Sequence, residues 1–481
     1  MFRFETFGNE GFWTDAMRMP QGMTAAKLTP IQALAAGLQI DVELLDAATQ
    51  KALIAELKTD RSAKQAPMLN DPKMTIKLIN ARAVIGVVPV DTNRDGKLDV
   101  ASGDKVGVAC AICHTITDGS VLADLGGGSI GRRIDGPANL KLNMGAILAM
   151  AANSRAYYPN LQAELGGATH GRAPKGLLKT STEAEVDAYL KNPAFYPVGT
   201  FDETSDGNGN PVKNTPLFRT DLAAPWGSSA SFAVLDHIGN GSFTINLDQT
   251  TLVTENGRKF LKQKGGKAGE ELADNYAFIL KATKVKGYPF VTASAMAMGP
   301  SAPVGLRVDD QKLFDLNAYT DSLPAPAAPP VDIARATRGR KMFQTDCTGC
   351  HNVDQGKHVP PMIVDMTTIF PGYAPVVIAQ REPPMSPIQD SPGTFDDKMI
   401  VEDASDRGEK RGTPLPLLLD LARTTLFLHD ASVTSLDQLL DPSRGAKAPH
   451  PFYVADPDRR VDMVEFLKSL DARPSGEQAR R

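Results

Sequence analysis

The sequence contains little cysteine, little net charge and no long apolar run. Its 481 residues include four cysteines, and 52 Lys plus Arg against 56 Asp plus Glu give a net charge of −4. This balance provides no basic field for nucleic acid, so we expect no nucleic-acid partner. Apolar stretches such as 145–152 are far shorter than the roughly 20 residues of a membrane-spanning helix, so we expect no membrane span.

All four cysteines lie in two copies of one motif, Cys-x-x-Cys-His. The copies contain, in chain order, Cys110, Cys113 and His114, then Cys347, Cys350 and His351. Cysteines three residues apart project from one face of a helical turn and can form thioethers with the two vinyl groups of one porphyrin. The next histidine then reaches the iron as proximal ligand. This spacing is the attachment signature of c-type haem and predicts two covalently bound haems.

Two other readings of a Cys-x-x-Cys pair are a dithiol redox site and half of a zinc site. A histidine directly after both copies, with no cysteine left over, favours haem. Because haem c is attached outside the cytoplasmic membrane, we expect a periplasmic or secreted protein. The N-terminus, Met-Phe-Arg-Phe, lacks the apolar core of a signal peptide, so we expect that one was removed from this numbering.

A Pro/Ala run at 323–330 divides the chain between the two motifs. Such a run cannot continue a helix and tends to be extended. We therefore predict a mostly helical N-terminal extension over 1–85, with a helix from Thr49 to Leu57, and a first haem domain over 86–322. The linker at 323–330 then leads to a second haem domain over 331–481.

Both predicted haem domains end in a similar amphipathic segment, 313–323 and 461–470, with Tyr319 matching Phe466. Apolar residues at helical spacing predict two equivalent helices, and 338–343 predicts another before the second motif. This order resembles the class I cytochrome c fold. The resemblance implies a mainly α protein with two such domains, the first with a long loop-rich insertion that contains short strands, among them 242–246.

The sequence indicates the second, distal iron ligand of each haem less clearly than the proximal histidine. For the second haem, His450 lies in a Pro-flanked loop shortly before the last helix, where a class I cytochrome places its distal ligand. His429 and Met385 are alternatives. For the first haem, the corresponding loop contains Met296 and Met298, which are also typical core residues. If neither binds the iron, the first haem has an open position and becomes the catalytic candidate.

An Asp-rich loop before the first motif resembles the start of an EF-hand calcium loop. Oxygen-bearing side chains occupy loop positions 1, 3, 5 and 9, which are Asp91, Asn93, Asp95 and Asp99. Position 7 is Lys97, which offers its main-chain oxygen. Gly96 stands at position 6. Position 12 is Ser102 instead of glutamate, so Asp104 would have to contribute. A polar turn without an ion is the alternative.

The segment 426–436, with His429, Asp430 and Ser432, resembles the His-Asp-Gly-Ser…Leu stretch of bacterial di-haem cytochrome c peroxidases and their relatives, the di-haem rubber oxygenases. The resemblance implies that the N-terminal haem meets peroxide or dioxygen and the C-terminal haem relays electrons. Where the peroxidases have a methionine ligand, this chain has Ser443, which again favours His450. In that family the histidine matching His429 is not an iron ligand.

Two hypotheses follow from these patterns. The chain is either a haem-dependent oxidoreductase that acts on peroxide or dioxygen, or a carrier in which both irons have six ligands. Either protein would need a redox partner protein or a small electron donor or acceptor. Trp226 is a candidate for the first haem pocket or for the space between the haems, and equally for ordinary core. No residue can be assigned a catalytic role from the sequence.

Overall fold

The computed structural model describes residues 1–59, 65–218, 220, 235–296, 299, 301–347, 363–365, 386–387, 400–401, 412–414, 418–428, 431–444 and 453–470. The chain forms two compact units. Unit 1 comprises Met1–Pro216 and Gly239–Leu316, and unit 2 comprises Leu217–Ile238 and Asn317–Arg481. The boundary crosses helices α8 (Leu235–Gly241) and α10 (Asp310–Ser322). Residues 1–85 thus belong to the same unit as the first haem motif, and the boundary falls just before the predicted linker.

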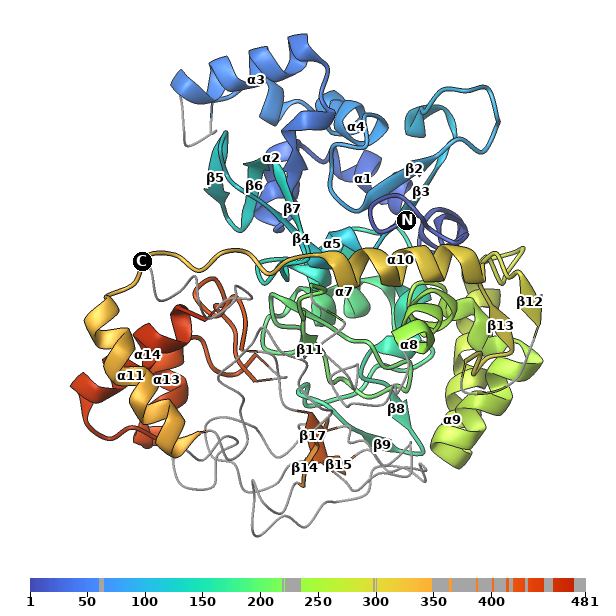
Figure 1. The fold of residues 1–481 in the computed structure, drawn as a ribbon. Coiled ribbons are helices and arrows are strands. Elements are labelled where there is room, and N and C mark those ends of the chain that lie inside the picture. The colour runs from blue at the N-terminus through green and yellow to red at the C-terminus, as the bar shows by residue number, and fades with distance from the viewer. Residues whose placement is uncertain are drawn as a thin grey trace. The chain divides into compact units, whose positions relative to one another are not determined.

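Helices predominate over short strands, so the mainly α class is confirmed (Figure 1). In unit 1 they include α1 (Met19–Ala26), α2 (Pro30–Ala35), α3 (Ala47–Thr59), α4 (Pro72–Asn80), α5 (Ala111–His114), α6 (Met144–Leu148), α7 (Glu183–Lys191) and α9 (Glu255–Ala282). Short segments of 3-10 or π helix lie at Phe12–Ala16, Val42–Leu44, Met68–Asn70, Val100–Ser102, Ser154–Asn160, Ser242–Asn246 and Gln249–Val253. The predicted helix from Thr49 to Leu57 is confirmed as part of α3.

Local signals explain where several helices start. Thr182 and Glu185 form a capping box at the start of α7, in which each side chain accepts a hydrogen bond from the other residue's backbone N–H. The Asp71 side chain accepts from the N–H of Lys73 at the start of α4, where Pro72 occupies the first helical position. Each of these signals lies within four consecutive residues, so it can be recognised in the sequence without knowledge of the fold.

Helix α9 consists of two segments joined at Gly266, whose φ of 53° and ψ of −128° are not helical. Ion pairs of 2.6 Å join Arg258 to Asp274 and Lys262 to Glu270. In a continuous helix, residues 258 and 274 would lie about 24 Å apart. The two segments therefore fold back on each other, and glycine provides the positive φ at the turn.

The strands of unit 1 are short and pair mostly in twos. One sheet has three strands, in which β1 (Ile40–Asp41) pairs in parallel with β6 (Gly128–Gly131), and β6 pairs with β5 (Leu122–Leu125). The antiparallel pairs are β2 (Val87–Val90) with β3 (Lys105–Val108), β4 (Thr115–Thr117) with β7 (Arg133–Asp135), β8 (Glu164–Leu165) with β9 (Ala168–Thr169), β10 (Thr200–Phe201) with β11 (Val212–Lys213), and β12 (Ala295–Met296) with β13 (Leu306–Arg307). Short strands among helices were predicted for this region.

The prediction of strand at 242–246 is wrong, because Ser242–Asn246 forms a turn of π helix. The Thr244 hydroxyl donates to the carbonyl of Asn240 at 2.8 Å. The Asn240 amide in turn donates to the carbonyl of Leu306 at 3.0 Å. Phe243 and Thr244 are both buried. Contacts with a distant segment thus outweigh the β propensity of these residues.

The described part of unit 2 is built on a pair of helices, α11 (Ile333–Asp346) and α14 (Pro457–Lys468), which lie side by side (Figure 1). The rings of Phe343 and Phe466 lie 5.2 Å apart between them. Both helices were predicted, as was α10, and all three are confirmed. The unit also contains α13 (Leu436–Leu440), a 3-10 turn at Pro442–Arg444, and the strand pairs β14 (Ile363–Asp365) with β17 (Gly412–Pro414) and β15 (Ser386–Pro387) with β16 (Ile400–Val401).

The Pro/Ala segment 323–330 has no regular secondary structure. Ala325 is nonetheless buried against Phe218 and Leu419, with Leu323 beside them. Within unit 2 this segment therefore packs on its own small apolar cluster.

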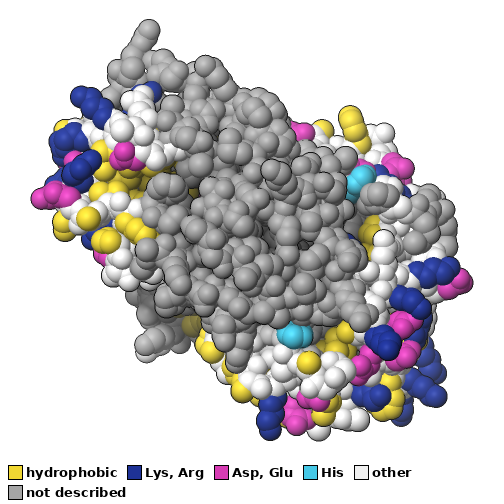
Figure 2. Space-filling view, turned by 90° about the horizontal axis from the view of Figure 1, so that it is seen from below, with side chains coloured by type: hydrophobic (Ala, Val, Ile, Leu, Met, Phe, Trp, Pro, Cys, Tyr) yellow, Lys and Arg dark blue, Asp and Glu magenta, His cyan; other side chains and the backbone are white. Residues whose placement is uncertain are grey.

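The described surface carries charges of both signs. On the face in Figure 2, lysine and arginine side chains lie among aspartate and glutamate side chains, in keeping with the net charge of −4. Of the helices within the described residues, none is long and apolar enough to cross a membrane.

Candidate haem-attachment site

The first Cys-x-x-Cys-His motif forms one isolated helical turn. Cys110 starts the turn, and its carbonyl accepts hydrogen bonds from the N–H of Cys113 at 3.3 Å and of His114 at 3.2 Å. The turn places residues three and four apart next to each other. Both thiols and the imidazole are therefore presented by the same short piece of backbone, as attachment to one porphyrin requires.

Backbone contacts with distant segments hold this turn. The N–H of Ala111 donates to the carbonyl of Phe2, and the N–H of Asn139 donates to the carbonyl of Cys113. Gly86 passes so close that a Cβ there would collide with the backbone of Ile112, and its φ of +76° also favours glycine. A helix of one turn is unstable in isolation, so its geometry depends on these neighbours.

The imidazole of His114 is oriented by a main-chain oxygen. Its Nδ1 lies 2.6 Å from the carbonyl oxygen of Thr215. A carbonyl can only accept, so Nδ1 carries the proton and Nε2 keeps its lone pair. Burial lowers the pKa of His114 to about 4, against the effect of the Thr215 bond. A neutral imidazole with a fixed tautomer and a free Nε2 is the state that ligates a metal.

Thr215 is held in place by its neighbour in the chain. It follows the β10–β11 hairpin, where the N–H of Asn214 donates to the carbonyl of Gly199. The Asn214 side-chain amide donates to the carbonyl of Asn139 at 3.1 Å, and the Asn139 amide donates to the carbonyl of Gly37 at 2.9 Å. Asn139 thus connects the segment that orients His114 with the turn that carries Cys113.

The two thiols of the motif are half-buried and do not form a disulfide. Burial raises the pKa of Cys110 to about 11 and that of Cys113 to about 12. Both are therefore neutral thiols at physiological pH, unlike the thiolates of a reactive dithiol site. Neutral thiols on one turn, followed by a neutral histidine, fit the donor set of a c-type haem.

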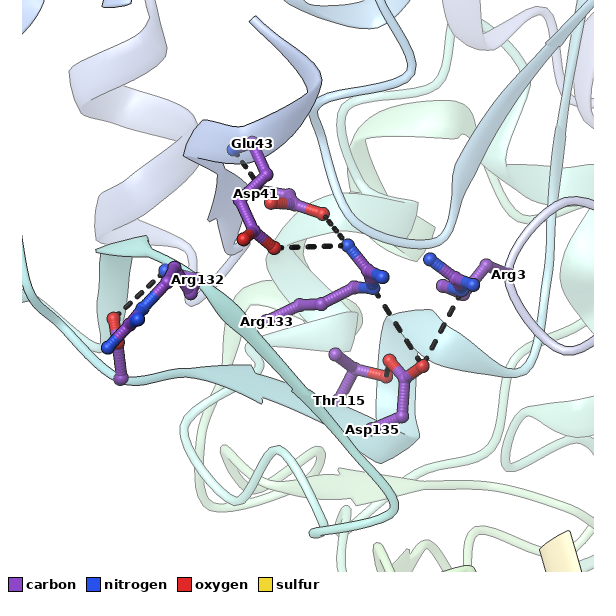
Figure 3. Close-up of polar contacts among 8 residues, drawn as sticks. Arg3, Asp41, Glu43, Thr115, Arg132, Arg133 and Asp135 are labelled. Atoms are coloured by element: carbon purple, nitrogen blue, oxygen red, sulfur yellow. Dashed lines mark hydrogen bonds and ion pairs between the residues drawn. The ribbon is translucent and has the colours of Figure 1, made fainter. Parts of the chain in front are cut away.

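Directly after the motif, an ion-pair network fixes strands β4 and β7 (Figure 3). The Thr115 hydroxyl donates to Asp135 at 3.0 Å, and Asp135 pairs with Arg3 at 3.5 Å. Arg133 binds the fully buried Asp41 at 2.9 Å. Burial disfavours the charge of Arg133, but Asp41 and the neighbouring carboxylates outweigh it and raise its pKa. Thr115, the residue after His114, is thereby tied to an Asp135 carboxylate that both Arg3 and Arg133 approach.

Two buried tyrosines, Tyr157 and Tyr196, lie within range of the electrostatic effect that an ionised Cys113 would have. Burial is the main cause that raises both phenol pKa values, so both stay protonated. The Tyr196 oxygen accepts a hydrogen bond from the N–H of Asp202 at 3.0 Å.

The second motif is described only at its first residue. Cys347 follows α11, where its N–H donates to the carbonyl of Phe343 at 2.9 Å, and its side chain packs against the core between α11 and α14. Met296 lies in β12 opposite Leu306. Ser443 lies in the 3-10 turn, and its N–H donates to Asp441 at 2.8 Å. Other residues singled out in the sequence lie outside the described residues: Trp226, Met298, Cys350, His351, Met385, His429 and His450.

The Asp-rich loop forms a compact turn. The Asp91 carboxylate accepts from the N–H of Asp95 at 3.2 Å and of Gly96 at 2.8 Å, and Asp104 accepts from the N–H groups of Thr92 and Asp99. Asp104 thus joins the two ends of the loop. Across the described ranges, no group of three or more His, Cys, Asp or Glu side chains is arranged to hold a metal ion. Calcium binding stays a prediction.

The sequence did not indicate Thr215, Asn139, Asn214, Tyr157 or Tyr196 as parts of this site. A main-chain acceptor carries no side-chain signal, and buried Asn and Tyr residues far from the motif have no spacing that links them to it. The histidine of the motif implies that some acceptor for Nδ1 exists. Only the fold identifies which one.

Comparison with known proteins gives no family assignment. No family model and no curated protein matches the chain. Among solved structures, the chain is similar to hydrazine synthase of Kuenenia stuttgartiensis pressurized with xenon, with 12% sequence identity and a TM-score of 0.27. That match covers 66% of this chain and 86% of the other. A similarity this low carries no argument about fold or function.

Proposed function

We propose that the chain is a periplasmic or secreted c-type cytochrome with two covalently attached haems, and that it works as an oxidoreductase. The observation that carries the proposal is the hydrogen bond from His114 Nδ1 to the carbonyl of Thr215 beside two neutral thiols. A dithiol redox pair does not need an oriented histidine on the same turn, whereas an iron ligand does. Zinc would also use such a histidine, but it binds thiolates and needs further protein donors. Among the described residues no group of three or more His, Cys, Asp or Glu side chains is arranged to hold a metal ion.

The residues that would hold the groups follow from the two motifs. Cys110 and Cys113 would form the thioethers of the first haem, with His114 as proximal ligand. The matching residues for the second haem are Cys347, Cys350 and His351, with His450 as distal ligand. Each bound haem supplies a one-electron couple, and an iron with an open position also reacts with peroxide or dioxygen.

We place the reaction with peroxide or dioxygen at the first haem and electron relay at the second. The buried phenols of Tyr157 and Tyr196 support this division, because a protonated phenol can donate a hydrogen bond and both lie within range of an electrostatic effect of Cys113. Hydrogen-bond donors in a haem pocket favour activation of a bound oxidant, and a simple carrier does not need them. The donor of electrons would be a redox protein or a small molecule.

The second unit is proposed to be a class I cytochrome c-like domain. In that fold, a first helix leads into the haem motif and packs against the last helix. Here α11 ends at Asp346, directly before Cys347, and it packs on α14 through Phe343 and Phe466. For the first unit, the same proposal rests on the motif and on α10.

Spectroscopy of the intact holoprotein tests the proposed reaction. We expect a high-spin component in the electron paramagnetic resonance spectrum of the oxidised or half-reduced protein, and carbon monoxide binding after full reduction. The variants M296A and M298A should leave the high-spin component unchanged. Only low-spin signals in both redox states, without carbon monoxide binding, would instead identify an electron carrier with two six-coordinate irons.

A further inference from the structure

Lys213 is a half-buried lysine without a partner. It is the last residue of β11 and lies opposite Thr200 in β10. Within the part of the chain that the structure describes, its ammonium group forms no ion pair and no hydrogen bond. Burial alone lowers the pKa of Lys213 to about 8. A half-buried cation without a counter-charge gains stability when an anion approaches it.

The buried acidic residue on the same hairpin loop is already engaged by other groups. Asp202 follows β10 and is fully buried. It accepts hydrogen bonds from the Thr204 hydroxyl at 3.1 Å and from the N–H of Asn210 at 3.2 Å. Burial, with Asp206 nearby, raises the pKa of Asp202 well above its usual value. Burial thus disfavours the charged form of Asp202, which is already engaged in hydrogen bonds within its own loop.

Lys213 stands close to the residue that orients the proximal histidine. It precedes Thr215 by two residues, and the Cα atoms of two such residues are at most about 7 Å apart. The Thr215 carbonyl receives the hydrogen bond of His114. A four-carbon stem from this position can bring an ammonium group to the edge of a porphyrin that is held by His114. That edge carries two propionate carboxylates, at the end away from the thioethers.

We propose that Lys213 is a positioning residue that pairs its ammonium group with a propionate carboxylate of the first haem. The inference rests on the proposed function, because it requires a haem on Cys110 and Cys113. The propionate would supply a counter-charge for the Lys213 ammonium group. The pairing also makes Lys213 a determinant of the redox potential, since a nearby positive charge favours the reduced iron, which carries less positive charge.

The test measures the midpoint potential of the first haem by spectroelectrochemistry of the intact holoprotein. The variant K213Q should shift that potential to a lower value, whereas K213R, which keeps the charge, should stay near the wild type. K175Q is the matched control, because Lys175 is an exposed lysine of the same unit. An unchanged potential in K213Q would overturn the inference.

A second measurement covers the case in which K213Q does not fold. Resonance Raman spectra report the propionate bending band, which responds to hydrogen bonding of the carboxylate. K213R should shift this band while its potential is retained, and K175Q should not. An unchanged band in K213R would contradict the pairing. If no haem is attached to Cys110 and Cys113, the proposed function itself fails, which mass spectrometry of the same samples distinguishes.

Discussion

The Nδ1 atom of His114 lies 2.6 Å from the carbonyl oxygen of Thr215, which is 101 residues further along the chain. This contact decides the tautomer of the imidazole and directs Nε2 to the side where an iron would be bound. The motif supplies the histidine, but a distant hairpin orients it. Disturbing that hairpin should therefore change the haem ligand without touching the motif.

Replacing Asn214 by alanine should weaken the site. The substitution removes the side-chain bond to the carbonyl of Asn139, which then keeps only the 3.4 Å bond from the N–H of Leu142. We expect the free energy of unfolding to fall by about 0.5–1.5 kcal/mol, and the Soret band to shift as His114 loses its fixed orientation. Chemical denaturation and absorption spectra measure the two effects. T215A is the control, because the carbonyl belongs to the main chain and the spectrum should stay as in the wild type.

The substitution G339A should separate α11 from α14. A Cβ at Gly339 would collide with the carbonyl of Asp462 and with the Cβ of Phe466. Forcing extra volume into such a contact costs typically 1–3 kcal/mol, so we expect a loss of stability of about that size. R340A, at an exposed position of the same helix, should change stability little. Equal stability of the two variants would show that the helices do not pack this closely.

Stability near Asp462 should depend on pH in a defined direction. The Arg338 guanidinium, with Arg335, holds the pKa of Asp462 below its usual value. A carboxylate with a lowered pKa stabilises the folded state above its unfolded pKa of about 3.9, and this contribution is lost as the pH falls through the lower folded value. D462N should therefore unfold more easily than the wild type at pH 7.

The difference between these two proteins should shrink when denaturation is repeated below about pH 4, near the unfolded pKa. Other carboxylates titrate in both proteins alike, so the comparison isolates Asp462. A difference that stays constant between the two pH values would rule out a role for its charge.

Calcium should stabilise the Asp-rich loop. D95N is a sharp test, because asparagine keeps the oxygen that accepts from the N–H of Lys97 and removes only the charge. At a calcium concentration one hundred times Kd, the wild type should gain about 2.7 kcal/mol, and D95N much less. Thermal unfolding with calcium and with a chelator measures this gain. Identical curves for the wild type in both conditions would leave the loop as a polar turn.

Sequence patterns predicted those elements whose signals are local. α10, α11 and α14 follow from apolar residues at helical spacing, and the turn at Cys110 follows from its motif. Ser242–Asn246 was predicted wrongly, because Asn240 ties it to a distant carbonyl. Helix caps and periodicity act over a few residues, whereas such ties depend on the complete fold.

The same distinction applies to the site. Cys110, Cys113 and His114 could be read from their spacing, since three residues of one turn must act together. Thr215 and Lys213 could not, because a main-chain acceptor and a half-buried lysine are recognised only when the β10–β11 hairpin is folded against the motif. The unit boundary at Leu316 also could not be predicted from the sequence, because it falls inside the regular helix α10.

Covalent haem content tests the central claim most directly. The full chain should be produced in a host that attaches c-type haem, denatured, and examined by intact mass spectrometry and by pyridine haemochrome absorbance. We predict two haems on the wild-type chain and one on each of the double variants C110A/C113A and C347A/C350A. A wild-type chain that retains no haem after denaturation, with zinc or a Cys110–Cys113 disulfide in its place, would contradict the account.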